Sequence, residues 1–169
     1  MNWYKKAIIE EVSENPIQQT VFHGTDKDFP ENELESGNNE IGVHFGTEEH
    51  ASNANFNVNR LIEKQININK PLRLKDKGSQ FTPFNVAEQL MDLEIAPKIW
   101  NDMDTRTNLT KNDVINTIEE LGYDGIVYLN RVELPPEDMH KIFSIPSNAT
   151  DEEFLQSIPN AKDSYILFE

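Results

Sequence analysis

The chain has 169 residues, of which 37% are hydrophobic, and its 30 acidic and 15 basic side chains give a formal net charge of −15. This length predicts one domain, over residues 1–169, with a core of its own. Because the chain has no cysteine, a disulfide framework and a thiolate metal site or nucleophile are excluded. An acidic surface repels phosphate backbones, so nucleic acid is an unfavourable partner and a basic protein a better one. Solubility alone is the alternative explanation for most of these charges.

The N-terminal segment carries no targeting signal that the sequence reveals. No apolar run approaches the roughly 18 residues that span a bilayer, and the opening residues lack the apolar stretch of a signal peptide. These features predict a cytoplasmic protein. Apolar side chains recur at helical spacing over residues 1–15, which predicts an N-terminal docking helix rather than a membrane anchor.

Two strand-like stretches, 17–25 and 41–45, each carry a histidine near their end and small residues directly after it. Their ends read His23-Gly24-Thr25 and Gly42-Val43-His44-Phe45-Gly46. Glycine beside a histidine lets a ligand approach the backbone, because no Cβ stands in the way. The two stretches are therefore predicted to be walls of one pocket. The alternative is two ordinary strands whose histidines are structural.

Helices and strands are also predicted in the rest of the chain, around a surface loop over residues 26–40. A helix is expected over 48–59, capped by Thr47, and a strand over 61–68 that continues after a break through 69–74. A second helix is expected over 84–93. A third begins after Thr110, with Asp113 as capping partner and Gly122 beyond its end, and a strand over 123–128 follows it.

Residues 134–162 interrupt what is otherwise a hairpin between strands 123–128 and 164–168. A loop of this length is uncommon unless it has a function. It contains a short helix over 150–155, for which Thr150 and Glu153 form a capping box. Its apolar side chains either pack on the domain or present a patch to a partner; they are Met139, Ile142, Phe143 and Ile145.

Three motifs in this order resemble the ADP-ribosyltransferase fold, in the branch related to poly(ADP-ribose) polymerases and to phage and mobile-element transferase domains. They are His23-Gly24-Thr25 for His-Gly-Ser, Gly42-Val43-His44-Phe45 for Gly-x-Tyr-Phe, and Asn53-Ala54-Asn55-Phe56 for Ser-Ala-Asn-Tyr. The stretch from Gly122 to Tyr128 is similar as well. The resemblance implies an α+β fold, in which two packed, mainly antiparallel sheets surround an NAD cleft with flanking helices.

The resemblance also implies that NAD is the substrate. His23 would bind the adenosine-side ribose, Gly24 would offer its backbone to the nicotinamide amide, and His44 would take the place of the stacking tyrosine. No metal is expected, because His44 and His50 lie six residues apart, off a common helical face.

Further cofactor contacts follow from the same motifs. Asn53 would replace the serine that bonds the amide, and Phe56 would be the second aromatic of the slot; a core aromatic is the alternative for Phe56. Thr25 and Phe45 complete the cofactor-binding motifs. The spacing to the third motif is one residue longer than in the polymerases.

The catalytic carboxylate is the largest departure from the polymerases. Their glutamate stands just before the last strand's tyrosine, where this chain has Ser164, which carries no charge. The resemblance to phage-type domains implies that Glu133, at the end of the preceding strand, is the catalytic carboxylate and that Ser164 lies at the cofactor. Asp163 is the reserve, and an exposed loop glutamate is the alternative for Glu133.

These implications add up to a mono-ADP-ribosyltransferase that moves ADP-ribose from NAD to a protein, for example as a phage or mobile-element effector. The acceptor protein is expected to bind through residues 134–162. Two alternatives are a catalytically silent member of the fold that binds NAD, ADP-ribose or a protein, and an NAD glycohydrolase.

Overall fold

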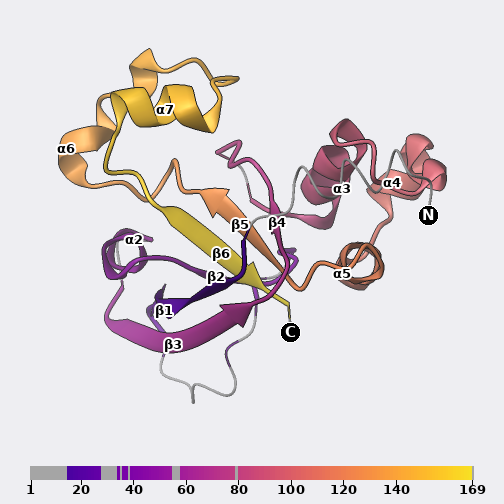
Figure 1. Cartoon of the computed structure of the whole chain (residues 1–169), viewed down its shortest axis with the longest axis horizontal. Helices are drawn as coiled ribbons and strands as arrows, with labels where there is room; N and C mark the ends of the chain where they lie inside the picture. The colour runs from indigo at the N-terminus through magenta and orange to yellow at the C-terminus, as the bar shows by residue number, and fades with distance from the viewer. Residues whose placement is uncertain are drawn as a thin grey trace.

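A computed structural model describes residues 15–27, 34, 36–37, 39–54, 58–78 and 80–168. It has an α+β fold in which the strands form two sheets and the helices lie mainly beside the larger sheet (Figure 1). Nearly all of the predicted docking helix over 1–15 lies outside the described residues. Among the described helices, none combines the length and the apolar character that a membrane crossing requires.

The smaller sheet consists of two long antiparallel strands. Strand β1 (Ile17–Thr25) pairs with β3 (Arg60–Ile68) over its full length, with Ile17 opposite Ile68 and Thr25 opposite Arg60. Apolar side chains at alternate positions of β3 face the interior, as a half-buried strand requires; they are Ile62, Ile66 and Ile68. The predicted bounds of both strands are confirmed to within one residue.

The larger sheet has four strands in the order β2 (Val43–Phe45), β6 (Asp163–Leu167), β5 (Gly125–Leu129) and β4 (Pro71–Arg73). Strand β4 is parallel to β5, and the other neighbours are antiparallel. The prediction of two mainly antiparallel sheets is confirmed. The second predicted strand begins two residues later than expected, at Val43.

The two sheets pack face to face and are joined at one point. The Phe22 N–H donates to the Gly46 carbonyl and the Gly46 N–H donates to the Phe22 carbonyl, both at 2.9 Å. Between the sheets lies an apolar cluster of Val21, Val43, Phe45, Ile66, Ile68, Val127 and Tyr165. The end of β1 is therefore held beside the end of β2.

The opposite face of the larger sheet is covered by α3 (Pro83–Asp92) and α5 (Lys111–Glu120), which pack on a core that includes Ile126, Tyr128 and Ile166. Strand β6 therefore contributes to both cores. Tyr165 and Leu167 face the smaller sheet, while Ile166 and Phe168 face the helices. This confirms the alternation predicted for the last strand.

Helix capping follows the sequence closely. The Thr110–Asp113 capping box starts α5, and Gly122 beyond its end has a φ of +92°. Thr47 caps α2 (Glu48–Asn53), but the expected continuation to residue 59 is wrong, because the described helix ends at Asn53. Short helical segments that the sequence did not predict are η2 (Lys98–Asn101), α4 (Met103–Thr107) and α6 (Pro136–Met139).

Residues 134–162 form a small subdomain beside the last residues of β5 and the first residues of β6. It contains α6, η3 (Ile142–Ser144) and α7 (Asp151–Ser157), and α7 begins with the predicted Thr150–Glu153 capping box. Its own core consists of Leu129, Leu134, Phe154, Ile158 and Ala161. Both readings of its apolar residues hold in part, because Ile142 and Ile145 pack on this core while Phe143 is 92% exposed.

A prediction follows from Gly24. A Cβ at this position would lie 1.9 Å from the carbonyl oxygen of Ala51, so α2 rests directly on the backbone of β1. We expect Gly24→Ala to lower the free energy of unfolding by about 1–3 kcal/mol, as overpacking does. Urea denaturation measures this loss. The control is Gly37→Ala, whose Cβ would meet only the side chain of Glu40; equal stability of the two variants would contradict the prediction.

Candidate functional site

The two histidines singled out in the sequence lie side by side. The Nδ1 atom of His23, on β1, is 2.7 Å from the carbonyl oxygen of His44, on β2. A carbonyl can only accept, so the Nδ1 of His23 carries the proton and donates it. The ring of Phe45 lies 5.8 Å from that of His23, centroid to centroid. The two stretches are therefore adjacent, but that they form the walls of one pocket stays a prediction.

The ring of His44 is held by aromatic neighbours. It packs against Phe81 and Tyr128, with centroid separations of 5.6 and 5.9 Å. Its Nδ1 lies 2.9 Å from the Tyr128 hydroxyl, and its Nε2 is buried with no hydrogen-bond partner in the part of the chain that the structure describes. Burial, together with nearby His23, lowers the pKa of His44 to about 4. The imidazole is therefore neutral at pH 7.

Glu133 follows β5 and is half-buried, so it is not the exposed loop glutamate of the alternative reading. Its Oε2 accepts a 2.7 Å hydrogen bond from Nδ2 of Asn130. The Oδ1 of Asn130 in turn accepts from the backbone N–H groups of Val132 and Glu133, which shapes the turn after β5. Burial raises the pKa of Glu133, and the hydrogen bond from Asn130 opposes this rise.

Ser164 lies on β6, opposite Tyr128 on β5. Its Oγ accepts a second hydrogen bond from Nδ2 of Asn130, at 3.0 Å, and lies 3.3 Å from Nδ1 of His50. Burial raises the pKa of the Tyr128 phenol well above its ordinary value, and the neighbouring Ser164 hydroxyl opposes part of this rise. Asn130 therefore bridges Ser164, which stands at the position of the polymerase glutamate, and Glu133, which was predicted to be the catalytic carboxylate.

Gly46 makes room for this arrangement. A Cβ there would stand 2.8 Å from Oγ of Ser164 and 3.0 Å from Cβ of His50. The absence of a side chain at Gly46 thus leaves room for the side chains of Ser164 and His50. In the same way, the close neighbour of Gly24 is the backbone of Ala51.

The remaining predicted site residues lie apart from this hydrogen-bonded group. Asn53 is exposed in the last turn of α2, and Phe56 lies outside the described residues. Phe45 is buried in the inter-sheet cluster, and Thr25 is buried with its Oγ1 bonded to the Lys27 N–H. Asp163, the reserve carboxylate, forms a 2.7 Å ion pair with Arg73. The roles of these residues stay predictions.

Sequence reasoning missed three members of the group, namely Tyr128, Asn130 and His50. The sequence pattern predicted Tyr128 to be a core residue, because it stands in an apolar strand. Asn130 carried a usable signal, because an asparagine three residues before a glutamate at a strand end is typical of a side-chain-stabilised turn. No group of three potential metal-ligating side chains is assembled within the described ranges.

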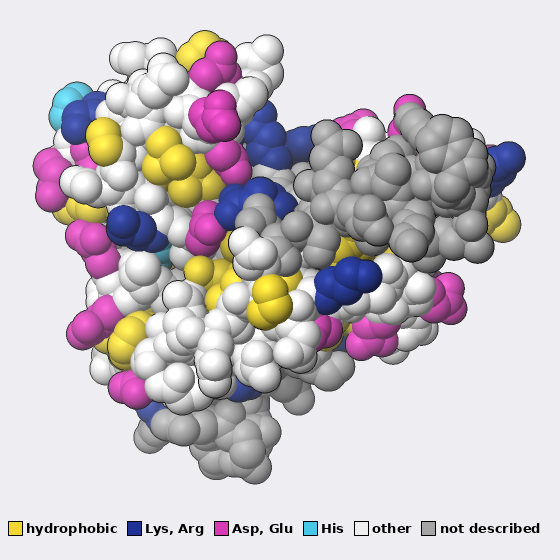
Figure 2. Space-filling view, in the orientation of Figure 1, with side chains coloured by type: hydrophobic (Ala, Val, Ile, Leu, Met, Phe, Trp, Pro, Cys, Tyr) yellow, Lys and Arg dark blue, Asp and Glu magenta, His cyan; other side chains and the backbone are white. Residues whose placement is uncertain are grey.

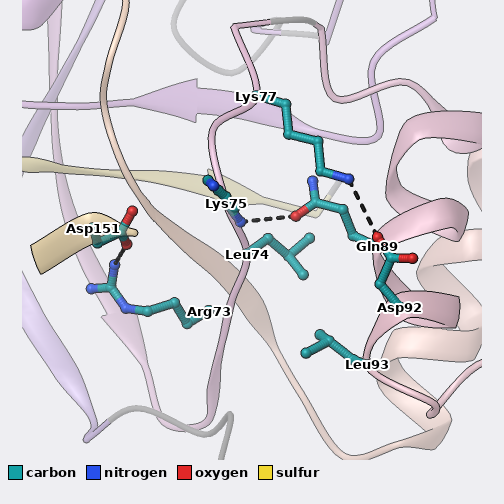
Figure 3. A pocket seen from close by; sticks show the side chains of 8 residues that line it. All are labelled: Arg73, Leu74, Lys75, Lys77, Gln89, Asp92, Leu93 and Asp151. Atoms are coloured by element: carbon teal, nitrogen blue, oxygen red, sulfur yellow. Dashed lines mark hydrogen bonds and ion pairs between the residues drawn. The ribbon is translucent and has the colours of Figure 1, made fainter. Parts of the chain in front are cut away.

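Three hollows lie around this end of the larger sheet. One of about 370 Å³ is lined by Arg73 and Lys77, but these cations pair with Asp151 and Asp92, at 3.2 and 3.4 Å (Figure 3). The second, of about 420 Å³, lies beside Phe143, where Figure 2 shows hydrophobic side chains gathered over the α6–α7 segment.

The third hollow, of about 840 Å³, lies between α2 and α6. It is lined by Thr47, one residue after Gly46, and by Pro135, two residues after Glu133. His23 and His44 do not line any of these three hollows. The hollow between α2 and α6 therefore adjoins the histidine group without containing it.

Comparisons of the chain with protein-family models, with curated proteins and with solved structures find no match. The chemistry of the site therefore rests on its own residues and their geometry.

A prediction follows from the burial of neutral His44. Its folded pKa of about 4 lies below the ordinary value of 6.5, so the unfolded chain binds more protons between these pH values. Above pH 6.5 the titration of His44 does not lower the free energy of unfolding, which then falls as the pH decreases from 6.5 toward 4. The loss reaches at most about 3 kcal/mol, at roughly 1.4 kcal/mol per pKa unit.

Urea denaturation between pH 4 and 7 measures this effect. His44→Gln should flatten the pH dependence relative to the unsubstituted protein, whereas His140→Gln, at an exposed loop position, should leave it unchanged. A pH dependence that is identical in all three proteins would show that His44 does not titrate as described.

Proposed function

We propose that the chain is a mono-ADP-ribosyltransferase, which takes NAD as its substrate and transfers ADP-ribose to a protein. The observation that carries this proposal is the convergence of His23, His44, Ser164 and Glu133 at one end of the larger sheet. They come from β1, β2, β6 and the end of β5. Polar contacts connect His23, His44 and Tyr128, and Asn130 bridges Ser164 and Glu133; Tyr128 and Ser164 stand opposite each other in the β5–β6 pair.

The chemistry asks for a group that stabilises positive charge. Breaking the bond between nicotinamide and ribose passes through an oxocarbenium-like state, as in other glycosidic cleavages, and a fixed carboxylate stabilises that state. Glu133 is held by Asn130 and by the turn after β5, so its carboxylate has a defined position. Half-burial strengthens its electrostatic effect, since water screens it less.

The nicotinamide ring needs a flat, uncharged surface. His44 is neutral at pH 7 because its pKa is about 4, and Phe81 and Tyr128 fix the plane of its ring. A neutral imidazole does not repel the positively charged pyridinium of NAD. This supports His44 in the place of the stacking tyrosine.

The acceptor is proposed to be a protein with a basic surface, which the net charge of −15 attracts. It would approach over residues 134–162, where the hollow of about 840 Å³ adjoins the turn that carries Glu133. Exposed Phe143 and Met139 offer apolar contact on the same segment. Because Ser164 stands where the polymerases have their glutamate, we propose single transfer rather than polymer formation, as in a phage or mobile-element effector.

The test is transfer of label from NAD to proteins of a host lysate. Glu133→Gln keeps an oxygen that accepts from Asn130 but loses the charge, so transfer should fall roughly 10²–10³-fold, as on removal of one electrostatic stabiliser. Glu119→Gln, an exposed change on α5 away from residues 134–162, is the matched control and should keep its activity. Full activity of Glu133→Gln would remove Glu133 from the mechanism.

A second candidate is a catalytically silent protein that binds NAD or ADP-ribose. The observation that favours it is Ser164, which cannot supply charge and is already engaged by Asn130 and His50. Calorimetry with NAD, combined with a measurement of free ADP-ribose, separates the possibilities. Binding without turnover indicates the silent binder, free ADP-ribose without labelled protein indicates a glycohydrolase, and no affinity for NAD or its fragments contradicts all three.

A further inference from the structure

The hydrogen bond between His44 and Tyr128 can run in either direction. Nδ1 of His44 lies 2.9 Å from the Tyr128 hydroxyl, and a neutral imidazole nitrogen either donates or accepts. The direction of this bond decides which ring nitrogen of His44 carries the proton.

Two arrangements are possible. In the first, Tyr128 donates to Nδ1 of His44, and the proton of His44 sits on Nε2. In the second, Nδ1 of His44 carries the proton and donates to the Tyr128 oxygen. The distance alone does not choose between them, because the bond connects the same two atoms in both.

Glu40 decides the choice. Its Oε2 lies 3.9 Å from Nε2 of His44, and both side chains are about three-quarters buried. The second arrangement points a nitrogen lone pair at a carboxylate, so two acceptors face each other in a poorly screened place. The first arrangement points an N–H group there, which is electrostatically favourable. Among the described residues, no atom forms a hydrogen bond with Nε2, so the carboxylate of Glu40 is the charged group that acts on it.

We propose that Glu40 and Tyr128 are positioning residues that hold His44 in its Nε2–H form, so that His44 is a hydrogen-bond donor through Nε2. The neighbouring His23 has the opposite form: it carries its proton on Nδ1, since it donates to the His44 carbonyl.

The consequence for a ligand rests on the proposed function. A donor at Nε2 of His44 selects a ligand with an acceptor oxygen at the edge of the imidazole ring, and that oxygen would replace Glu40 as the group facing the N–H. A ligand with only a donor at this point would meet an N–H group and lose the bond.

The test reads the protonated ring nitrogens directly. Long-range ¹H–¹⁵N correlation spectra at pH 7 distinguish the two neutral forms of histidine, and loss of one peak set in His44→Gln assigns His44. We expect Nε2–H for His44 and Nδ1–H for His23 in the ligand-free protein. A His44 that carries its proton on Nδ1 would overturn the proposal.

Two variants test the positioning residues. Glu40→Gln replaces an acceptor by a group that both donates and accepts, and Tyr128→Phe removes the hydroxyl but keeps the ring. In each, a second set of His44 peaks from the Nδ1–H form should appear, while Glu137→Gln should leave the spectrum unchanged. Spectra of both variants that still show only the Nε2–H form would contradict the roles of Glu40 and Tyr128. If Tyr128→Phe does not fold, Glu40→Gln decides alone.

Addition of NAD separates this inference from the proposed function. A shift of the His44 Nε2 signal on titration with NAD supports the donor role toward the ligand. An unchanged signal, with the Nε2–H form already established, would contradict that donor role and the NAD site while the tautomer assignment stands.

Discussion

The joint between β1 and β2 is the interaction on which the rest of this structure depends. Two backbone hydrogen bonds connect Phe22 and Gly46, and the inter-sheet apolar cluster fixes the sheets on either side of them. Because side chains of a strand alternate in direction, this joint sends Phe45 into the core and leaves His44 on the opposite face. His23 then reaches the His44 carbonyl. A change of register by one residue would exchange core and site side chains.

Polar groups buried beside this joint are stabilised by one another. An unpaired buried polar group costs roughly 1–3 kcal/mol, so such groups are retained in connected sets. Here Asn130 uses both amide hydrogens and its carbonyl oxygen, and its partners extend from the turn after β5 to Ser164 on β6. The exception is Nε2 of His44, which is buried with no hydrogen-bond partner among the described residues.

The subdomain of residues 134–162 combines two requirements. Its own small core allows it to fold against the end of β5 and β6 without disturbing the sheet. Its exposed apolar side chains and the adjoining hollow between α2 and α6 remain outside that core. The segment therefore offers a surface next to Glu133 whose composition can differ without loss of the site.

Local signals in the sequence determined much of this protein. Strand β1, the alternation of β6, and the caps at Thr47, Thr110 and Thr150 depend on residues close together in the chain, so the sequence predicted them correctly. The helix expected over 48–59 ended early, and α4 was missed. Segments of only one or two turns have marginal stability of their own, and tertiary contacts such as the 2.8 Å bond from Arg106 to the Trp100 carbonyl hold them.

Only the tertiary structure decided the membership of the site. His23 and His44 stood out because a glycine follows each within two residues, yet the close neighbours of Gly24 and Gly46 are protein atoms. Tyr128 and Ser164 meet only because β5 and β6 pair in one register, and Asn130 reaches both Ser164 and Glu133 only at the end of that pair. A hydrogen bond requires two atoms within about 3 Å, and residues distant in sequence reach that separation only through the packing of the whole chain.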